Sequence, residues 1–319
     1  MALQQIESPQ SETPQERFFR HIESERRFSP LTVRNYRHDV EGFVAWLEAE
    51  CGKSSPCKAT TENVREWILH RSSLRHPKQN RPLLSPASIN RELCSLRALF
   101  RWLLERGEMT CEIMRPIRSL KSPRRLPVFV AESRMRDVVT QEVEEGAFEA
   151  VRDKLMLLLF YTCGVRLAEL IGIDRTDFSD DYSTLRLRGK GNKEREVPIL
   201  GFVREKIIAY LALIDGQKIC RIGQKALILT AKGERISRST VYRIVQRRLG
   251  EAGVPGKKSP HVLRHTFATH LLNGGADMRE IQELMGHSSL QATQVYTHNS
   301  IASLQEIYQK AHPRERREE

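Results

Sequence analysis

Five side chains of this chain could together hold and attack a phosphate. Arg166 lies near the middle of the sequence, His261 and Arg264 share one short segment, and His287 and Tyr296 follow. An arginine pairs two N–H donors with two phosphate oxygens and keeps its charge, so two arginines can neutralise a transition state. A tyrosine hydroxyl, whose pKa is about 10, becomes nucleophilic when a base takes its proton or cations stabilise the phenolate. The set indicates attack of a phenol on a phosphodiester.

Composition and charge favour a nucleic-acid partner. The chain of 319 residues has a formal net charge of +12 and a pI near 9.6, so its field attracts polyanions. The same charge also fits a soluble protein with a well-hydrated surface, so charge alone does not decide. The length and a hydrophobic content of 39% suffice for two buried cores, and we expect two domains.

The sequence predicts a soluble protein of the reducing cytoplasm, with no membrane partner. Its six cysteines include no C-x-x-C pair. The N-terminus lacks the order of charged, apolar and small residues that marks a signal peptide. The longest strongly apolar stretch, residues 155–165, is far shorter than the ~20 residues that cross a bilayer.

A helical domain with four helices is predicted between about Glu16 and Gly107. Apolar side chains recur at helical spacing around residues 18–22, from residue 29 to 47, and over 61–70. The fourth helix has Ser85 as N-cap, Pro86 at its first position and Gly107 at its end. Its apolar residues follow the spacing of a buried stripe: Ile89, Leu93, Leu96, Phe100 and Leu103.

A polar stripe of Asn90, Arg97 and Arg101 runs beside that apolar stripe. Two interpretations of it stay open. The stripe is either the solvated face of the helix or a face that contacts DNA.

A basic segment with several prolines follows the predicted helical domain. Pro116, Pro123 and Pro127 break regular structure, and a lone Glu112 is outnumbered by cations. Such a segment can lie along a phosphate backbone while it joins two domains that close around a duplex. Its basic residues are Arg115, Arg118, Lys121, Arg124 and Arg125. We therefore expect a helical domain over 11–110, a linker over 111–128 and a second domain over 129–319.

The second domain is predicted to be mixed α+β, mainly helical with one small sheet. Residues 184–187 alternate as a strand does, 189–192 supply turn residues, and 194–199 return, which places Lys190 at a hairpin tip. Helices are expected over 150–161, 167–173, 202–213, 238–252, 261–273, 278–285 and 291–297. An apolar stripe packs either on its own domain or on a neighbouring protomer: Ile301, Leu304, Tyr308 and Ala311.

Five motifs in this order closely resemble those of the tyrosine site-specific recombinases, and among them the Xer type. The resemblance extends from about residue 11 to 313 and is strongest over 155–298. The motifs are Gly164-x-Arg166-x-x-Glu169-Leu170, Gly189-Lys190-Gly191-Asn192-Lys193-Glu194-Arg195, His261-x-x-Arg264-His265-Thr266-Phe267-Ala268-Thr269-His270, Gly286-His287-Ser288-Ser289 and Tyr296-Thr297-His298.

The resemblance implies two DNA-clamping domains and a tyrosine that becomes joined to the 3′ phosphate of a cut strand. It implies these roles: Arg166 and Arg264 bind the scissile phosphate, Lys190 protonates the leaving 5′ oxygen, His261 is acid and base, His287 donates to a phosphate oxygen, Tyr296 is the nucleophile, and Glu169 supports the site. Lys193 on the same hairpin is an alternative to Lys190. Cys163 stands where the family has a threonine, which changes the packing behind Arg166.

The predicted chemistry needs neither a metal nor ATP, and no cofactor is expected. Exchange of a phosphodiester for a phosphotyrosyl ester is nearly isoenergetic, and no Walker loop occurs. The cations Arg166, Lys190 and Arg264 can stabilise charge for which many nucleases recruit two metal ions. His261 and His265 stand four residues apart and could in principle bind zinc, but no third ligand accompanies them.

The resemblance implies a double-stranded DNA substrate and a tetrameric synaptic complex, formed by copies of this chain or with a paralogous recombinase. An Xer-like enzyme would resolve chromosome or plasmid dimers at cell division, in the cytoplasm at the nucleoid, and a DNA translocase could be an activating partner. The alternatives are a phage or mobile-element integrase, a type IB topoisomerase that acts alone on one duplex, and a non-catalytic DNA-binding architectural protein.

Overall fold

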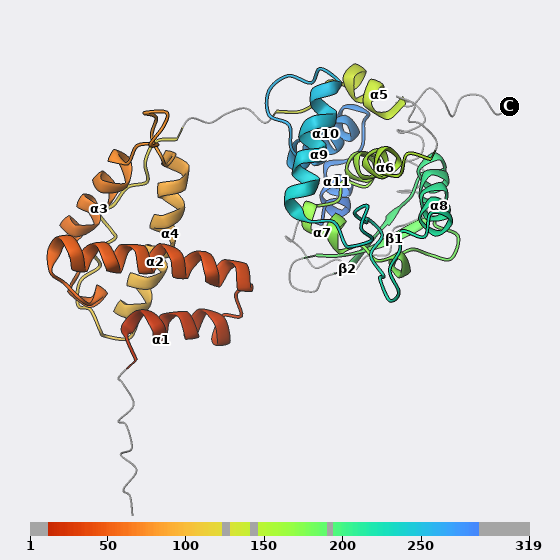
Figure 1. Cartoon of the computed structure of the whole chain (residues 1–319). Helices are drawn as coiled ribbons and strands as arrows, with labels where there is room; N and C mark the ends of the chain where they lie inside the picture. Colours follow the sequence, from red (N-terminus) through yellow and green to blue (C-terminus); the bar gives the residue numbers. More distant parts are fainter. Residues whose placement is uncertain (1–11, 123–127, 141–145, 190–193, 287–319) are drawn as a thin grey trace, which may run out of the picture. The chain divides into compact units, whose positions relative to one another are not determined.

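The chain folds into two compact units, Met1–Arg125 and Leu126–Glu319 (Figure 1). The structure is a computed structural model that describes residues 12–122, 128–140, 146–189 and 194–286. Within these ranges no helix is long and apolar enough to cross a membrane.

The first unit is helical, as its apolar periodicity predicts. Each α-helix begins after a side-chain cap, and each cap accepts a hydrogen bond from the backbone N–H three residues ahead. Gly107 follows the last helix at a φ of 71°, which fits its predicted role as the end of that helix. The helices are α1 (Pro14–Arg20), α2 (Pro30–Cys51), α3 (Thr61–Ser73) and α4 (Pro86–Glu105), with a π turn at His21–Glu25 and a 3-10 turn at Pro56–Lys58.

Helix α4 lies at the centre of this unit and packs against α1, α2 and α3. The apolar stripe predicted for α4 is buried throughout, from Ile89 to Leu103. Phe100 of this stripe meets Phe43 of α2 edge to face, with ring centroids 5.8 Å apart. The periodicity therefore identified the core-facing side of the helix correctly.

Part of the predicted linker belongs to the first unit instead. Ile113, Met114 and Ile117 are buried in the core that α1 to α4 form. Further along, the side chain of Asn90 bonds both the N–H and the carbonyl of Leu120, at 2.8 and 2.9 Å. The prolines and charges of this segment predicted a linker, although its apolar residues recur every three or four positions.

The second unit is mainly helical with a two-stranded antiparallel sheet. Its helices are α5 (Glu132–Thr140), α6 (Phe148–Thr162), α7 (Leu167–Gly172), α8 (Gly201–Gly216), α9 (Arg238–Glu251), α10 (Pro260–Asn273) and α11 (Met278–Leu284), with a 3-10 turn at Arg175–Asp177. The strands β1 (Thr184–Arg188) and β2 (Glu194–Pro198) pair in the register that sets Leu187 opposite Arg195.

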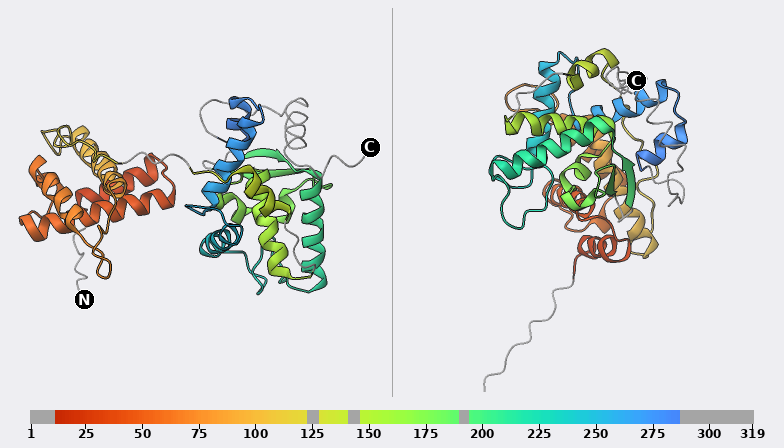
Figure 2. Two further views of the ribbon diagram at one scale, coloured as in Figure 1. Left: turned by 90° about the horizontal axis from the view of Figure 1, so that it is seen from above. Right: turned by 90° about the vertical axis from the view of Figure 1, so that its right-hand side faces the viewer.

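Helix α6 is the centre of the second unit. Residues 155–161 of it are all buried, and it packs against α8 on one side and α10 on another (Figure 2). A helix that is apolar on nearly every side is expected to be enclosed in this way. The hairpin adds Leu185, Leu187 and Val197 to the same core.

The predicted fold class is confirmed: a helical first unit and a mixed second unit with a small sheet. Helix α5 was not predicted, because its apolar residues Met135, Val138 and Val139 make no clear stripe. Of residues 132–139, Met135 and Val138 are buried. The helix expected over 291–297 and the apolar stripe beyond it lie outside the described residues.

Candidate active site

Glu169 in the first turn of α7 is the centre of the candidate site. Its side chain is 3% exposed, and it accepts two hydrogen bonds of 2.7 Å from Arg166, one from the backbone N–H and one from Nη1. Arg166 is the N-cap residue of α7, so its backbone N–H lies within reach of a carboxylate three residues later. The guanidinium of Arg166 is thereby fixed at the start of the helix.

Arg195 on β2 reaches the same carboxylate from the hairpin. Its Nη1 lies 2.7 Å from Oε1 of Glu169 and its Nη2 lies 2.8 Å from Oε2. Such a pair of parallel bonds is the strongest geometry for an arginine and a carboxylate.

Arg264 on α10 joins the cluster as a third guanidinium. Its Nη1 lies 4.0 Å from Oε2 of Glu169, and the side chain is 8% exposed. It also donates to the backbone carbonyls of Gly164 and Met285. The predicted phosphate-binding residues Arg166 and Arg264 are therefore brought together, although 97 residues separate them in the chain.

The three guanidiniums also meet three successive carbonyls where α11 ends. Arg195 Nε donates to Leu284 at 2.9 Å, Arg264 Nη2 to Met285, and Arg166 Nη2 to Gly286 at 2.7 Å. The last carbonyls of a helix lack partners in the helix and carry partial negative charge, so cations are favourable there.

Charge in this cluster is unbalanced. Burial would raise the pKa of the Glu169 carboxyl, but hydrogen bonds and charge from Arg195, with hydrogen bonds from Arg166, lower it to about 2. Burial and the neighbouring charge of Arg166 lower the pKa of Arg264 to about 10, so it stays protonated at neutral pH. Three cations share one anion, and the surplus positive charge favours a further anion such as a phosphate.

Two glycines allow the close packing around these arginines. Gly164 has a φ of 56°, and a Cβ there would lie 2.5 Å from the ring of Phe267. Gly286 has a φ of 60°, and a Cβ there would lie 3.2 Å from Cδ and Nη1 of Arg195. Both positions need a residue without a side chain.

Cys163 lies buried directly before Gly164. Burial raises the pKa of its thiol to about 11, so the group is un-ionised at neutral pH. Its sulfur lies 3.5 Å from the hydroxyl of Thr162. The thiol thus packs in the core of the second unit as a small apolar group.

His261 is exposed in the first turn of α10, one turn before Arg264. Partial burial lowers the pKa of His261, and the charges of Lys257 and Arg264 lower it further. A neutral imidazole can accept a proton at neutral pH. In the described part of the chain, no group of three or more His, Cys, Asp or Glu side chains could hold a metal ion.

A half-buried chain of hydrogen bonds anchors the far end of α10. His270 bonds the hydroxyl of Tyr161 through Nδ1 and the carbonyl of Val130 through Nε2, both at 3.0 Å. Because a carbonyl only accepts, Nε2 carries the proton and Nδ1 accepts from the tyrosine. Burial lowers the pKa of His270, which fits a neutral ring in this position.

Several predicted site residues lie outside the described residues: Lys190, His287, Tyr296, Arg124 and Arg125. The described chain stops on either side of Lys190, at Gly189 and Glu194, and ends at Gly286 directly before His287. Two described residues beside these gaps contact the cluster: Arg195 follows Glu194 and bonds Glu169, and the carbonyl of Gly286 accepts from Arg166.

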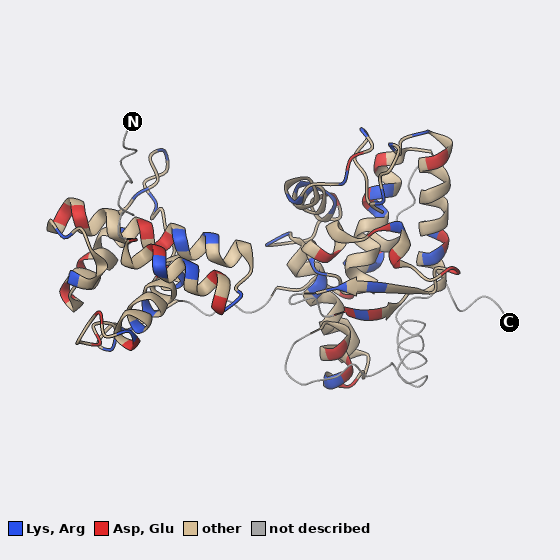
Figure 3. Ribbon diagram, turned by 90° about the horizontal axis from the view of Figure 1, so that it is seen from below, with Lys and Arg blue, Asp and Glu red and all other residues tan. Residues whose placement is uncertain are grey.

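The predicted DNA-facing stripe of α4 has other contacts. Asn90 holds Leu120, and Arg97 donates to the carbonyl of Ile117 at 3.1 Å, so both fasten the segment that follows α4. Neither interpretation of the stripe included this role. The other described cations of the set are exposed: Arg101, Arg115, Arg118 and Lys121. Figure 3 shows acidic residues interspersed with the basic ones in both units.

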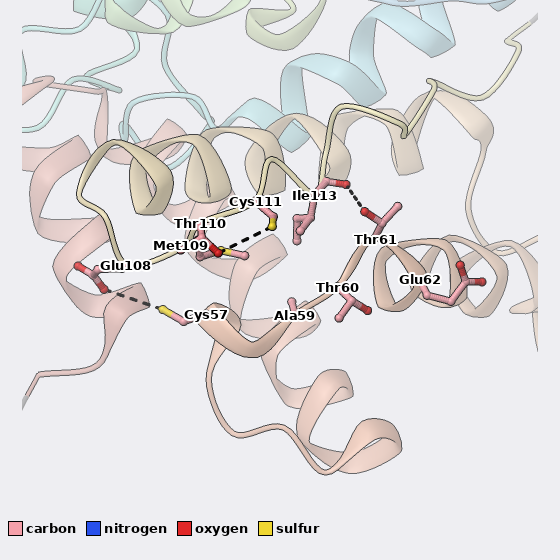
Figure 4. Close-up of a pocket in the computed structure, with 10 residues that line it drawn as sticks. All are labelled: Cys57, Ala59, Thr60, Thr61, Glu62, Glu108, Met109, Thr110, Cys111 and Ile113. Atoms are coloured by element: carbon pink, nitrogen blue, oxygen red, sulfur yellow. Dashed lines mark hydrogen bonds between the residues drawn. The ribbon is translucent and has the colours of Figure 1, made fainter.

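An open pocket in the first unit contains none of the predicted site residues (Figure 4). It is lined by Cys57, Thr61, Glu108, Cys111 and neighbouring residues. Thr61 donates to the carbonyl of Ile113 across it, at 3.0 Å. The predicted catalytic residues therefore do not line this pocket.

Comparison with known proteins identifies the family. The Phage integrase family matches residues 135–302, and the N-terminal SAM-like domain of phage integrases matches residues 16–107. Tyrosine recombinase XerC of Pelobacter propionicus is 38% identical over 296 residues, which are 93% of this chain and 94% of that protein. The chain belongs to the tyrosine recombinase family. Tyrosine recombinase XerD of Corynebacterium glutamicum is 35% identical over 92% of this chain and 96% of its own, so this recombinase is of the Xer type.

A solved relative shares the fold of this tyrosine recombinase. The XerH site-specific recombinase, in a post-cleavage complex with its palindromic difH substrate, is 21% identical and superposes with a TM-score of 0.66. The match covers 89% of this chain and 81% of that one.

The motifs of the recombinase named one residue of the cluster without giving it a role. Arg195 appeared in the hairpin motif, but the sequence analysis did not distinguish it from its neighbours. Strand alternation was the available signal, since it places residues 195, 197 and 199 on one face and the other two are Val197 and Ile199. An arginine on a core-facing position needs an anionic partner.

Proposed function

We propose that this tyrosine recombinase cuts and rejoins double-stranded DNA at specific sites through a 3′-phosphotyrosyl intermediate. Arg166 and Arg264 would hold the scissile phosphate, Tyr296 would attack it, and Lys190 would protonate the leaving 5′ oxygen. His261 would act as acid and base, and His287 would donate to a phosphate oxygen. Lys190, His287 and Tyr296 enter the proposal through the sequence motifs alone.

The observation that carries the proposal is the surplus charge of the Glu169 cluster. Arg166 is fixed by two bonds to Glu169 and still has 35% of its side chain exposed. Arg166 and Arg264 have further N–H donors beyond those used within the protein. A phosphate entering here would meet oriented donors and uncompensated positive charge, which stabilise an oxyanion best when they are preorganised.

The chemical step is a displacement at phosphorus. The phenol oxygen of Tyr296 forms a bond to phosphorus as the bond to the 5′ oxygen breaks, and the phenol proton leaves to a base. The 5′ oxygen takes a proton and departs as a hydroxyl. Reversal by a 5′ hydroxyl of another strand rejoins the backbone, so the energy of the cut bond is kept in the phosphotyrosyl ester.

His261 is suited to the proton transfers in this scheme. Its lowered pKa keeps the ring neutral near pH 7, so it can take a proton from the phenol and return one. The neighbouring charge of Arg264 lowers the pKa of the ring, so the protonated ring gives up its proton readily. The same cation would bind the phosphate.

The wider role follows from the relatives. XerC and XerD relatives match most of the chain, and the XerH structure contains its DNA substrate. We infer that four protomers, identical or shared with a paralogue, act on two duplexes to resolve chromosome or plasmid dimers at the nucleoid in the cytoplasm. A DNA translocase would be a suitable activating partner.

The test is to trap and sequence covalent adducts. The purified recombinase is incubated with sheared host DNA, stopped with detergent, and the protein-bound fragments are recovered and sequenced. We expect wild type to yield adducts at a few defined sites and Tyr296→Phe to yield none while still binding DNA. Tyr308→Phe is the matched control, since it removes a phenol from the same end of the chain, and it should yield adducts like wild type.

Two outcomes would reject the proposal. Adducts formed equally by Tyr296→Phe would exclude this nucleophile. A wild-type protein that binds DNA and never forms an adduct, even on nicked fragments, would make the chain a DNA-binding protein without the cutting activity.

A further inference from the structure

We propose that Arg195 is a positioning residue for strand cleavage: it clamps Glu169 and the end of α11, and so aligns Arg166. The inference rests on the proposed function and assigns a role to a residue outside the predicted catalytic set.

The location of Arg195 on the hairpin is unusual for an arginine. It lies opposite Leu187 on the strand face that also presents Val197 to the core. Its side chain is only 11% exposed. A cation in this position is unfavourable unless its charge and its donors are satisfied, so its partners are essential to the packing.

Every nitrogen of the Arg195 guanidinium has a partner in the protein. Nη1 and Nη2 bond the two oxygens of Glu169, and Nε bonds the carbonyl of Leu284. Arg166, by contrast, is 35% exposed. Arg195 therefore acts through other residues, whereas Arg166 can take a phosphate.

The clamp connects three segments that the proposed reaction needs together. Arg195 itself stands on β2, one residue after Glu194, where the described chain resumes. Glu169 orients Arg166 at the start of α7. Leu284 lies at the end of α11, two residues before Gly286.

Gly286 gives independent support for this connection. The guanidinium of Arg195 lies against its backbone so closely that a Cβ would be 3.2 Å from Nη1 and 3.4 Å from Cζ. The glycine before His287 thus makes room for the arginine of the hairpin. Two motifs that are distant in the sequence depend on each other at this point.

The clamp also keeps Glu169 ionised. The charged groups that face this carboxylate are Arg166 at the start of its own helix, Arg195 on β2 and Arg264 on α10. Burial raises its pKa, and Arg195 makes the largest opposing contributions. Without Arg195 the pKa of Glu169 rises, and a protonated Glu169 holds Arg166 less firmly.

The experiment uses the full chain with substitutions at Arg195 and a matched control. Arg195→Met removes the charge and the clamp, Arg195→Lys keeps the charge, and Arg186→Met removes an exposed cation from β1 of the same hairpin. The substrate is a nicked duplex that carries a site recovered by adduct mapping. The first-order rate of adduct formation at saturating protein, the Kd for the duplex, and the pH dependence of the rate are measured.

We expect Arg195→Met to slow adduct formation on the order of 10²-fold, because small misplacement of catalytic groups has effects of this size. Its Kd should stay within about threefold of wild type, since the residue makes no substrate contact. The rate should also fall at a higher pH on the acid side than in wild type. Arg195→Lys should restore that pH dependence and remain on the order of 10-fold slow, because one ammonium cannot span three acceptors.

Arg186→Met should match wild type in rate and pH dependence. An Arg195→Met variant that cleaves like Arg186→Met, or that loses only affinity for the duplex, would overturn the proposal. If Arg195→Met does not fold, Arg195→Lys decides: a rate equal to that of wild type would exclude the clamp.

A second measurement separates this proposal from the proposed function. Hydrogen exchange of the backbone amides around the end of α11 should be faster in Arg195→Lys than in wild type or Arg186→Met, without DNA. If wild type forms no adduct that requires Tyr296, the proposed function is wrong. The hydrogen-exchange measurement still tests the clamp in that case. Unchanged exchange together with unchanged cleavage would reject the clamp alone.

Discussion

Two of the buried carboxylates, Asp39 in the first unit and Glu169 in the second, show how differently the same residue types can be used. Asp39 on α2 is fully buried and accepts two bonds from Arg91, at 2.7 and 2.9 Å, and one from Ser95 at 2.7 Å. Its one negative charge is matched by one arginine. Glu169 on α7 is almost as buried, but three guanidiniums converge on it.

The difference lies in the balance of charge and in what the arginines do with their remaining donors. The pair of Asp39 and Arg91 satisfies itself, so it needs nothing from outside and joins α2 to α4. The Glu169 cluster keeps surplus positive charge and an exposed edge at Arg166, so it is completed by an added anion. A balanced pair holds the fold, whereas an unbalanced cluster is suited to bind a phosphate.

The largest difference between the two sites is expected when one arginine is removed from each. Arg264→Ala should slow adduct formation by about 10²- to 10³-fold, because it removes a preorganised contact to the transition-state charge. Arg91→Ala should leave the rate at saturating DNA unchanged and lower the melting temperature of the protein. Single-turnover cleavage and thermal unfolding, measured on both variants, check the two expectations. If Arg264→Ala keeps its rate and loses only affinity, Arg264 is a docking residue.

Neutralising each carboxylate should also separate the two clusters. Glu169→Gln leaves three guanidiniums without a counter-charge, which should cost about 3–5 kcal/mol of stability and reduce cleavage. Asp39→Asn leaves one arginine that is 49% exposed and can turn to water, so the cost should be about 1–3 kcal/mol with cleavage intact. Denaturant unfolding of both variants measures the difference. Equal losses would mean that the surplus charge at Glu169 is screened by contacts other than this carboxylate.

Much of both units could be predicted from the sequence because local chemistry decides them. The cap at Ser85, the stripe of α4 and the turn residues between β1 and β2 each predict one structure without reference to the rest of the chain. Helix α5 lacks such a signal, since it is positioned by burial of Met135 and Val138 against the core of the second unit.

The candidate site was predicted less completely, for a physical reason. Motif spacing pointed to Arg166, Arg264 and Glu169, which the fold does bring together. It could not reveal that Arg195 completes the cluster, because that depends on the pairing of β2 with β1 and on where α11 ends. The contacts of Asn90 and Arg97 within the first unit were missed for the same reason: their partners lie 20 to 30 residues away in a segment that was predicted to be a linker.

Acid should weaken the Glu169 cluster selectively. The pKa of Glu169 is about 2 in the fold and about 4.5 otherwise, so its ionised form contributes stability that is complete above about pH 4.5. That contribution is lost as the pH falls from 4.5 toward 2. Free energies of unfolding measured across this range should fall more steeply for wild type than for Glu169→Gln, which has no carboxyl to protonate. Parallel curves would show that Glu169 contributes little to acid unfolding.

The surplus charge should also be measurable at His261. Burial and the charges of Lys257 and Arg264 lower its pKa below the ordinary value of 6.5. Nuclear magnetic resonance titration of the ring should therefore give a lower midpoint in wild type than in Arg264→Met, where one of the cations is gone. In wild type, cleavage should stay constant through neutral pH and fall when the ring becomes protonated, since Glu169 stays ionised at neutral pH. A midpoint that does not respond to Arg264→Met would place His261 outside the field of the cluster.

The smallest expected effect concerns the thiols, which again differ between the two units. Cys163 is buried in the core of the second unit with its pKa raised to about 11, whereas Cys94 and Cys111 of the first unit are exposed. Because the thiolate is the reactive form, iodoacetamide at neutral pH should modify Cys94 and Cys111 and leave Cys163 untouched in the folded protein. Peptide mass mapping before and after unfolding identifies which cysteines are modified. Rapid labelling of Cys163 under native conditions would mean that the core beside Gly164 opens readily. Because the carbonyl of Gly164 accepts from Arg264, a cluster that opens there could not hold its guanidiniums in a fixed orientation.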